Sequence, residues 1–386
     1  MTTTIDNEHK TFNVPNLRFP EFEGEWQEKR LSDIADLSKG IGISKDQLSA
    51  DGEPCILYGE LYTKYKSETI KEVISKTNID NTKLVKSKAN DVIIPCSGET
   101  AEEIATARCV LKDDILLGGD LNIIRLHGYD GSFMSYQLNG KRKYDIAKVA
   151  QGVSVVHLYG EHLKNIKTIN PSLNEQKKIA NLLSLLDERI STQNKIIEDL
   201  KKLKSAISER LFKDAKGDII TLSEICDIVK GEQINGELLS EHGKYYVMNG
   251  GTDPSGYYDN YNVGAHTISI SEGGNSCGYV QFNKCPFWCG GHCYSIQNIA
   301  DNINNLYLYH YLKTEEKAIM KLRIGSGLPN IQKKDLATFK IKLPTSKQQK
   351  AISDILSLLE QKAEIEEQIL IAMQDEKQYL LRQMFI

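Results

Sequence analysis

Apolar residues recur at alternating steps of three and four along two long stretches of the chain, residues 171–212 and 344–385. This spacing predicts two long amphipathic helices, each with a coiled-coil seam. Polar residues interrupt both seams at matching places, where they cost stability but fix the register of pairing. The apolar positions that we expect to pair the helices are Leu183, Leu186, Ile190, Ile197, Leu200 and Ile207 in the first stretch, and Leu356, Leu359, Leu370, Met373 and Leu380 in the second; the polar interruptions are Gln193 and Lys204, matched by Glu366 and Lys377.

The two helical stretches are copies of one another at a constant spacing of 173 residues, so that Pro171 recurs as Pro344 and Phe212 recurs as Phe385. A register without gaps that keeps several identities other than leucine is not explained by shared helical composition. A chain made of two related halves usually meets a target that also has two halves. The other identities fall at Gln176, Lys177, Ile179, Leu183, Ser184, Leu185, Leu186, Ile196 and Lys204 of the first copy.

The duplication extends beyond the helices. Residues Leu31–Asp36 return as Leu222–Asp227 at a spacing of 191, and a Lys-Gly pair follows in both copies. The second copy is therefore shorter, and the ends of the copies agree better than their middles. Copies that agree at their ends but differ in their middles predict one scaffold that presents two different reading surfaces. The further correspondences are Lys39-Gly40 with Lys230-Gly231, Tyr58-Gly59 with Asn249-Gly250, Leu117–Asp120 with Cys289–His292, and Gly152 with Gly325.

Short apolar runs alternate with Gly- and Asn-containing turns between the helical stretches. Asp91–Pro95 and Asn122–Leu126 are rich in β-branched residues and predict strands, whereas Leu31–Ser38 predicts a short helix capped by Ser32 and closed near Gly40. We therefore expect an α+β protein with a pseudo-twofold internal repeat. The expected organisation is an N-terminal arm (1–25), a first domain (26–170), a central helix (171–216), a second domain (217–343) and a C-terminal helix (344–386).

Composition bounds the class of protein. A chain of 386 residues with 40% hydrophobic and 26% charged residues can bury two substantial cores. No run of about 18 apolar residues occurs, and residues 1–10 lack the apolar core of a signal peptide, so we expect a cytoplasmic protein. The eight cysteines show no pairing pattern, which favours free thiols over a disulfide framework.

The formal net charge of -4 is unusual for a protein that holds nucleic acid by itself, because such proteins are usually basic. Any basic surface must therefore be local. The second helical stretch is acidic, which indicates protein partners. Local lysines are nevertheless frequent in the first domain, where the run could equally be a solvated face: Lys64, Lys66, Lys71, Lys76, Lys83, Lys86 and Lys88, with Lys141, Arg142 and Lys143 later.

Three segments carry a resemblance to a known family. The segment Pro15–Phe22 leading to Trp26, the Leu-Ser-Asp-Ile-Ala start at Leu31, and the segment Asn249–Tyr258 are similar to elements of the specificity subunits of type I restriction-modification systems. The resemblance covers nearly the whole chain. It implies two target recognition domains, separated and braced by two antiparallel helices, that each read one half of a bipartite DNA site.

The same resemblance implies the partners and cofactors. The helices would set the unread spacer and dock two methyltransferase subunits, and two ATP-dependent motor-nuclease subunits would join for cleavage. About 40 helical residues make a rod of roughly 60 Å, which can hold two heads on successive major-groove faces about 34 Å apart. The chain has neither the Asn/Asp-Pro-Pro-aromatic tetrapeptide of adenine methylation nor a phosphate-binding loop for ATP. We therefore expect a non-catalytic chain without cofactors, with S-adenosylmethionine, ATP and magnesium in the partner subunits.

Polar loops beside the predicted strands are the candidates for base reading, since Gly allows close backbone approach and polar side chains match major-groove edges. Ordinary hairpin turns are the alternative interpretation of the same residues. In the first domain the candidates are Tyr62, Lys64, Lys66, Ser97, Gly98, Glu99 and Thr100; in the second they are Thr252, Asp253, Ser255, Tyr257, Tyr258, Ser271, Glu272, Gly273, Gly274 and Asn275. Candidate phosphate contacts are Gly152 and Ser154 in the first domain, and Arg323, Ser326, Asn330, Gln332 and Lys333 in the second.

Other chemistry was weighed against this interpretation. Cys285, Cys289 and Cys293 recur every four residues, but this spacing and the neighbouring aromatics favour a buried strand and turn over a zinc site, so no metal is expected. His157 and His162 have no histidine counterparts in the second copy, which argues against catalysis and leaves DNA-facing and structural roles open. The remaining alternatives are an unrecognised nuclease that uses scattered carboxylates, and a purely structural coiled-coil scaffold.

Overall fold

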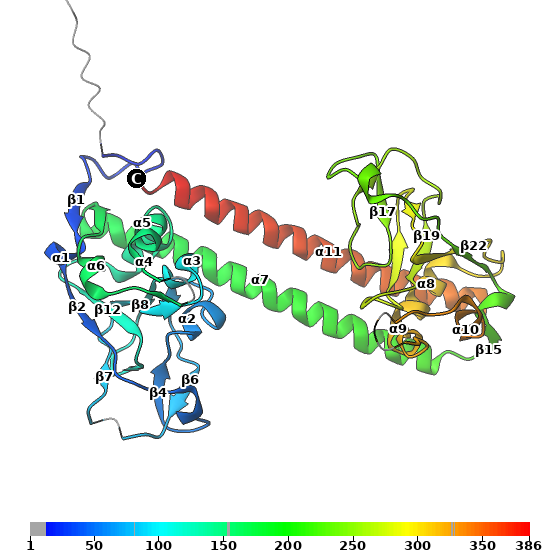
Figure 1. Cartoon of the computed structure of the whole chain (residues 1–386), viewed down its shortest axis with the longest axis horizontal. Helices are drawn as coiled ribbons and strands as arrows, with labels where there is room; N and C mark the ends of the chain where they lie inside the picture. Colours follow the sequence, from blue (N-terminus) through cyan, green and yellow to red (C-terminus); the bar gives the residue numbers. More distant parts are fainter. Residues whose placement is uncertain (1–12, 81, 153–154, 326, 328) are drawn as a thin grey trace, which may run out of the picture. The chain divides into compact units, whose positions relative to one another are not determined.

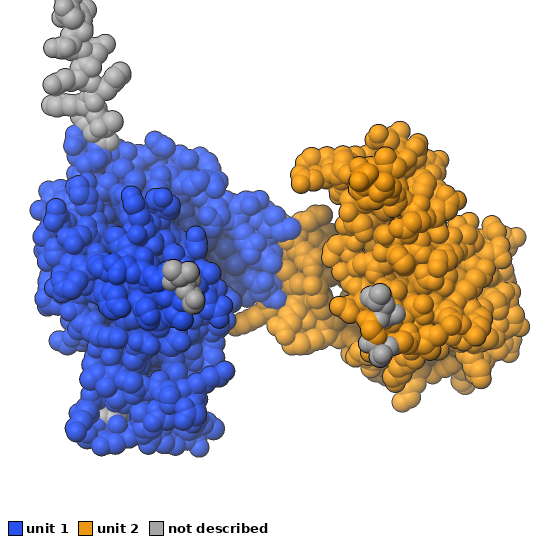
Figure 2. Space-filling view, in the orientation of Figure 1, with its two compact units in different colours: residues 1–194, 369–386 blue, residues 195–368 orange. Residues whose placement is uncertain are grey.

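The computed structural model describes residues 13–80, 82–152, 155–325, 327 and 329–386. They form two compact units: unit 1 comprises residues 1–194 and 369–386, and unit 2 comprises residues 195–368 (Figure 2). Each unit holds one mixed α+β domain together with one half of each long helix (Figure 1). The compact units thus cut across the helices, which the sequence pattern had set apart as separate segments. None of the described helices is long and apolar enough to cross a membrane.

Unit 1 is built on a five-stranded sheet in the order β2-β12-β8-β10-β5, in which only β5 runs parallel to its neighbour. Helix α4 (Gly131–Asn139) packs on β8 and β10, and apolar residues from both layers are fully buried between them. The bounds are β2 (Ala35–Lys39), β12 (Leu121–Leu126), β8 (Asp91–Pro95), β10 (Arg108–Val110) and β5 (Thr69–Ile70).

The remaining elements of unit 1 are short. A second sheet has the order β3-β6-β4-β11-β7, and two further strand pairs, β1-β14 and β9-β13, are antiparallel. The bounds are β1 (Gln27–Arg30), β3 (Leu48–Ser49), β4 (Glu53–Ile56), β6 (Ser75–Thr77), β7 (Val85–Lys86), β9 (Ser97–Gly98), β11 (Leu116–Leu117), β13 (Val156–His157), β14 (Lys167–Asn170), α1 (Leu31–Ile34), η1 (Lys45–Gln47), α2 (Glu60–Thr63), α3 (Ala101–Ile104), α5 (Lys143–Val149) and α6 (Gly160–Lys164).

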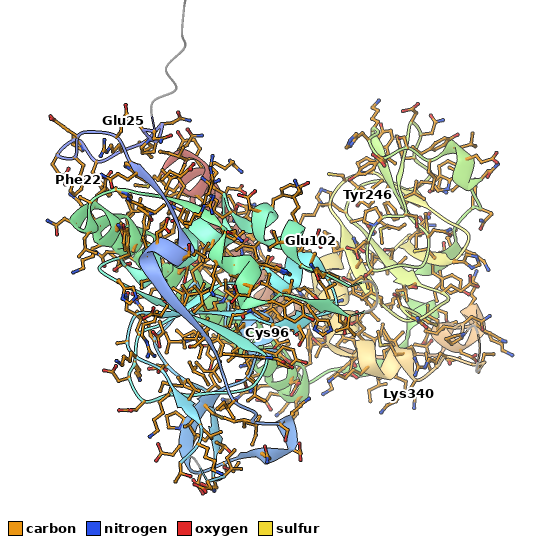
Figure 3. All side chains as sticks on the ribbon, turned by 60° about the vertical axis from the view of Figure 1, so that its left-hand side comes forward. Phe22, Glu25, Cys96, Glu102, Tyr246 and Lys340 are labelled. Atoms are coloured by element: carbon orange, nitrogen blue, oxygen red, sulfur yellow. The ribbon has the colours of Figure 1, made fainter. Side chains whose placement is uncertain are left out.

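Unit 2 repeats this plan in a reduced form. Its antiparallel sheet has the order β16-β22-β19-β20, and a smaller sheet has the order β18-β17-β21. The bounds are β15 (Asp218–Thr221), η2 (Leu222–Glu224), β16 (Asp227–Lys230), η3 (Gly236–Leu238), β17 (Tyr245–Met248), β18 (Tyr257–Tyr258), β19 (Thr267–Ser271), β20 (Val280–Asn283), β21 (Trp288–Cys289), β22 (Cys293–Gln297), α8 (Asn305–Thr314), α9 (Glu316–Met320), α10 (Lys333–Ala337) and β23 (Lys340–Leu343, with Lys340 labelled in Figure 3).

The predicted internal repeat is confirmed strand by strand. Strands β2, β12, β8 and β10 of unit 1 correspond in order and direction to β16, β22, β19 and β20 of unit 2. The parallel pair β4-β11 likewise corresponds to β17-β21, and β1-β14 to β15-β23. Both predicted strands are present, as β8 and β12. The α+β fold class with a pseudo-twofold repeat is therefore correct.

The predicted helix over Leu31–Ser38 is wrong beyond its first turn. Helix α1 ends at Ile34, and the following residues Ala35–Lys39 form β2, paired along its length with β12. Tertiary pairing overrides the local helical signal here, because β12 offers a full ladder of backbone hydrogen bonds.

The long helices are α7 (Leu173–Asp214, 42 residues) and α11 (Ser346–Gln383, 38 residues). They begin in the same way. Gln176 donates to the carbonyl oxygen of Pro171 at 2.9 Å and accepts from the backbone N–H of Asp130 at 2.9 Å. Gln349 repeats the first bond with Pro344 at 2.9 Å and the second with Asn304 at 2.8 Å. Since Asp130 and Asn304 cap α4 and α8, the repeated glutamine ties each long helix to the domain that precedes it.

Within each unit the two helix halves run antiparallel. In unit 2, Lys204 pairs with Glu360 at 3.0 Å and Lys201 with Glu367 at 2.7 Å, so numbers rise along one helix and fall along the other. In unit 1, Leu183 packs in one cluster with Met384, while Lys377 further back along α11 pairs with Asp187. Every predicted seam position is buried or half-buried, and the polar interruptions Gln193 and Glu366 are buried as well.

Each long helix ends in the core of the other copy's domain. Phe385, at the end of the second copy, stacks on Phe133 of α4 in unit 1 with ring centroids 5.1 Å apart. Phe212, its counterpart in the first copy, packs edge-on against Tyr307 of α8 in unit 2 at 5.6 Å. All four rings are buried, so each domain needs residues of both copies to complete its core.

Candidate DNA interface

A short hairpin stands at the same place in both units. In unit 1, Gln151 and His157 exchange backbone hydrogen bonds of 2.9 and 2.7 Å. In unit 2, Ile324 and Asn330 exchange equivalent bonds of 2.8 and 3.0 Å. The first hairpin pairs through β13 with β9, just beyond the end of β8; the second bridges through Asn330 to Gly273, just beyond the end of β19. The 173-residue spacing therefore relates two hairpins on equivalent strand ends.

Glycine is required at the first turn of both hairpins. Gly152 has a φ of 127° and Gly325 has a φ of 97°, a region that L side chains rarely adopt. A Cβ at Gly152 would also collide with the carbonyl oxygen of Val155. The other predicted residues of the two turns, Ser154 and Ser326, lie outside the described residues.

The repeated Lys-Gly pair lies next to each hairpin. A side chain at Gly40 would collide with the Gly118 carbonyl oxygen, and one at Gly231 with that of Gly290, so both glycines permit close backbone approach. The preceding lysines each pair with an acid: Lys39 with Asp120 at 3.3 Å, and Lys230 with Glu272 at 2.6 Å. These two lysines were seen in the sequence as part of the repeat but not as site residues.

Two cavities open in unit 1, and the smaller one reaches the hairpin at His157. The smaller, of 240 Å³, is lined by Lys39, Asn122 and His157 among others, and the larger, of 910 Å³, includes Tyr62. Asp120 lines both, so the cavities adjoin at the Lys39 ion pair. Cys96, which directly follows β8 and is labelled in Figure 3, also lines the smaller cavity.

The thiol of Cys96 has no nucleophilic character. Burial raises its pKa to about 11, so it stays protonated near neutral pH. The predicted strand and turn in the cysteine-rich segment is confirmed, since Cys289 ends β21, Cys293 begins β22 and both are buried, whereas Cys285 is exposed. Among the described residues no group of three or more His, Cys, Asp or Glu is arranged to hold a metal ion.

The structure divides the base-reading candidates of unit 1. Tyr62 is half-buried at the large cavity, and Ser97, Gly98 and the exposed Glu99 follow β8 at the hairpin. The other three are partly engaged inside the unit. Lys64 Nζ donates to Glu60 at 2.6 Å and to Ser75 at 2.8 Å, and Lys66 Nζ donates to the Tyr62 carbonyl oxygen at 3.2 Å. The Thr100 side chain accepts from the backbone N–H of Glu103 and so caps α3.

In unit 2 the candidates fall into two groups. Ser271 and Glu272 are buried: Ser271 donates to the Gly250 carbonyl oxygen at 2.5 Å, and Glu272 accepts from Lys230 and from Tyr294 at 3.1 Å. Their oxygens are thus engaged within the unit. The exposed or half-buried group consists of Thr252, Asp253 and Ser255 in one loop, Tyr257 and Tyr258 in β18, and Gly273, Gly274 and Asn275 at the hairpin.

The candidate phosphate contacts of unit 2 surround its hairpin. Arg323 precedes the hairpin and is exposed, as are Asn330 and Lys333, whereas Gln332 is half-buried at the start of α10. In unit 1 an aromatic group takes this place. Tyr159 lies between His157 and His162 with ring centroids 6.1 and 5.6 Å away, and it is 54% exposed.

Exposed apolar residues also repeat along the long helices. Leu185 and its counterpart Leu358 are 50% and 65% exposed, and Ile196 and its counterpart Ile369 are 40% and 38% exposed. All four lie off the buried seams. The same exposed apolar positions therefore recur in both copies.

Two related domains with matching hairpins, each completed by a helix of the other copy, define an internally duplicated two-headed α+β protein. A family model described as the type I restriction modification DNA specificity domain matches residues 23–202 and again residues 216–374. The chain belongs to this family.

Relatives and solved structures agree with this assignment. A putative type I specificity subunit of Mycoplasma genitalium is 34% identical over 147 residues, 37% of this chain, and the match spans only 38% of that relative. The specificity subunit of a type I restriction enzyme from Methanocaldococcus jannaschii is 26% identical over 390 residues, with 90% of this chain and 88% of the relative covered. The fold is that of a crystallised type I restriction-modification S subunit from M. genitalium, with a TM-score of 0.70, 22% identity, and coverage of 97% of this chain and 99% of the other.

Proposed function

We propose that this chain is the DNA-specificity subunit of a type I restriction-modification complex and that it reads a bipartite site, with one half-site for each unit. The observation that carries the proposal is the repeated hairpin, because two equivalent supports at corresponding strand ends present different side chains. Unit 1 offers Tyr62, Glu99 and the His157 group, whereas unit 2 offers Thr252, Asp253 and Asn275. One scaffold with unlike polar edges suits two half-sites of unlike sequence.

The long helices serve as the spacer and as the docking surface in this proposal. Helix length changes in steps of about 1.5 Å per residue, so the number of helical residues would set the unread distance between half-sites. The exposed pairs Leu185 with Leu358 and Ile196 with Ile369 support the docking of two methyltransferase subunits at equivalent surfaces. Two motor-nuclease subunits would join the assembly for cleavage.

The chain itself would carry out no chemistry. S-adenosylmethionine, ATP and magnesium would be bound by the partner subunits, and the complex would act in the cytoplasm. The alternative of an unrecognised nuclease predicts DNA cleavage by the purified chain with magnesium alone. The alternative of a structural scaffold predicts methylation without sequence preference after assembly with a methyltransferase subunit.

The test is an exchange of residues 26–170 for the first domain of another specificity subunit, followed by genome-wide mapping of N6-methyladenine. We expect one half-site to change while the other half-site and the spacer are kept. Alteration of both half-sites, or loss of all preference, would count against independent reading. A second variant with one heptad inserted into both α7 and α11 should lengthen the spacer or abolish methylation, and an unchanged spacer would contradict the spacer role.

A further inference from the structure

A groove of 510 Å³ in unit 1 has a strongly positive rim. It lies where the end of α4 and the beginning of α5 meet α11. Its only carboxylate, Glu68, is already bound by Lys377 at 2.7 Å. The cations that line the groove are Arg108, Lys141, Lys143 and Arg382.

The floor of the groove is electrically balanced. Lys377 pairs with both Glu68 and Asp187, and Arg108 is the second cation near these carboxylates. The Arg108 guanidinium is buried and donates to the carbonyl oxygens of Tyr65 and Ala107, both at 3.0 Å. Two cations therefore face two carboxylates at the floor, and the excess charge belongs to the rim.

The rim cations are available to a ligand. Lys141, Lys143 and Arg382 form no ion pair within the described part of the chain, and Lys141 and Arg382 are exposed. Ile371 lies on the same face of α11, because Gln378 and Arg382 follow it by seven and eleven residues, which is roughly 10 and 16 Å along the helix axis. It is 57% exposed. An extended segment that enters the groove could therefore also reach this exposed apolar side chain.

The equivalent positions in unit 2 do not repeat these cations. At the 173-residue spacing, Lys143 corresponds to Glu316 and Arg382 to Glu209, while Ile371 corresponds to Glu198. Glu316 is bound by Lys313 at 2.6 Å, and Glu198 by Lys202 at 2.7 Å. The combination of these cations with the exposed Ile371 is therefore found in unit 1 and is not repeated at the corresponding positions of unit 2, although the folds of the units match.

We propose that this groove docks an acidic segment of a protein partner, with one such segment for each chain. The inference rests on the proposed function, since the partner that we assign to it is the methyltransferase subunit bound at unit 1. Carboxylate side chains can enter a concave surface between three cations, and Ile371 would cover an apolar side chain of the same segment. A DNA backbone would leave Ile371 without a contact, which favours protein over phosphate.

The consequence is that two identical methyltransferase subunits share the repeated apolar positions of the helices but meet the three cations only at unit 1, so they bind with unlike affinities. The attraction at unit 1 is between exposed charges, so it weakens as salt screens it. We expect calorimetric titration of the full chain with the methyltransferase subunit of the same system to resolve two sites at low salt. The tighter site should lose affinity between 50 and 300 mM salt, values chosen to span Debye lengths of about 14 to 6 Å.

The decisive variant is the triple reversal K141E/K143E/R382E in the full chain. We expect it to lower the affinity of one site by about tenfold or more, to remove most of the salt dependence and to leave the other site unchanged. The matched control is K83E/K86E/K88E, which makes the same charge change with exposed lysines elsewhere in unit 1. The neutral variant K141Q/K143Q/R382Q should fall between wild type and the reversal, and unchanged thermal unfolding would show that the variants fold.

A zero-length carbodiimide cross-linker adds a direct readout, because it joins lysine amines to carboxylates in contact. Cross-links from Lys141 or Lys143 to Asp or Glu of the methyltransferase subunit are expected. Equal loss at both sites, no loss at either, or normal assembly with weaker DNA binding to all sequences would each overturn the inference, the last by assigning the groove to phosphate. If the wild-type chain bound no methyltransferase subunit at all, the proposed function itself would fail, which is a different result.

Discussion

Tyr136 of α4 donates a hydrogen bond to Asp187 of α7 at 2.8 Å, and the pair recurs 173 residues later as Tyr309 and Glu360 at 3.0 Å. The same spacing relates the two seam lysines, since Lys377 binds Asp187 in unit 1 and Lys204 binds Glu360 in unit 2. Each unit therefore holds its helix pair to its domain through one tyrosine, one carboxylate and one lysine, and the lysine always comes from the other copy's helix.

The two lysines should differ in their contribution to stability. Lys377 faces two buried carboxylates, which raise its pKa against the effect of burial, whereas Lys204 faces one carboxylate that is 29% exposed. Lys377→Gln removes the cation that both acids bind and leaves only Arg108 nearby, and it should cost about 3–5 kcal/mol. Lys204→Gln should cost clearly less. Urea unfolding of both variants checks the order, and equal costs would contradict it.

The loss of stability caused by Lys377→Gln should depend on pH. Burial already raises the pKa of Glu68 in the presence of Lys377, so removal of the lysine should favour the protonated acid further. The stability gap between wild type and Lys377→Gln should therefore narrow as the pH is lowered. A gap that is constant between pH 8 and pH 5, conditions on either side of the expected titration, would argue against uncompensated charge as the cause.

Phe385→Ala should destabilise unit 1 and leave unit 2 nearly unchanged. The ring is buried and stacks on Phe133, and removal of such a side chain typically costs about 3–5 kcal/mol. Hydrogen exchange should become faster in α4 but not in α8, and Phe212→Ala should show the reverse. Tyr379→Ala, on the exposed face of the same helix, is the control and should change stability by about 0.5 kcal/mol or less. Equal acceleration in α4 and α8 would refute the assignment of each ring to one unit.

The stability of unit 2 should fall as the pH falls from about 6.5 to about 4. Burial lowers the pKa of His310 to about 4, so the folded chain keeps this imidazole neutral where the unfolded chain, with a pKa near 6.5, binds a proton. Unfolding takes up that proton, which costs the fold up to about 3 kcal/mol across this window. Glu360, whose pKa is lowered by Lys204, loses its contribution at lower pH still.

His310→Gln should flatten this part of the pH profile, because glutamine does not titrate and is the residue that the first copy has at the equivalent Gln137. Urea midpoints measured at pH 7.5, 6 and 5, values that bracket the window, provide the comparison. His242→Gln, at an exposed position, is the control and should keep the wild-type slope. The same slope in both variants would rule out His310 as the group responsible.

Gly152→Ala should impair the reading of one half-site. The substitution forces a side chain into left-handed backbone at a cost of about 1–2 kcal/mol, and its Cβ meets the Val155 carbonyl oxygen. Methylation mapping should show relaxed or lost preference at a single half-site, and Gly325→Ala should affect the other. Gly128 also has a positive φ, of 77°, but lies in open space, so Gly128→Ala controls for general backbone strain. Loss of preference at both half-sites with Gly152→Ala would disprove the separate use of the two hairpins.

Much of the fold could be predicted because the sequence contains two related copies of it. The gap-free 173-residue spacing predicted the helices, and the structure explains why Gln176 had to recur: it joins the start of the helix to the cap of α4. The same spacing relates Tyr136 to Tyr309 and Asp187 to Glu360, so the sequence also carries a signal for these repeated contacts. The wrong helix at Ala35–Lys39 has a different cause, because a partner strand 83 to 91 residues away decides its conformation.

The reading surface was harder to predict, because exposure depends on neighbours that are distant in sequence. The sequence suggests that the Glu272 carboxylate lies in a loop where it could accept a hydrogen bond from a DNA base, but it already accepts hydrogen bonds from Lys230 and Tyr294 within unit 2. Lys64 is of a residue type that often contacts DNA, but its Nζ already donates hydrogen bonds to Glu60 and Ser75. Gly152 and Gly325 recur in the sequence because the backbone of each turn adopts a positive φ that favours glycine; their contact with DNA stays a prediction.

The ion pair between Glu68 and Lys377 joins residues that are 309 positions apart in the chain. During synthesis the ribosome therefore delivers the first domain long before the helix that closes its core, and that domain must wait through translation of the whole second one. Vectorial maturation, one finished domain after another, is closed to this protein. Contacts of such long sequence separation also make folding slow, so nascent chains should depend on chaperones until α11 has emerged.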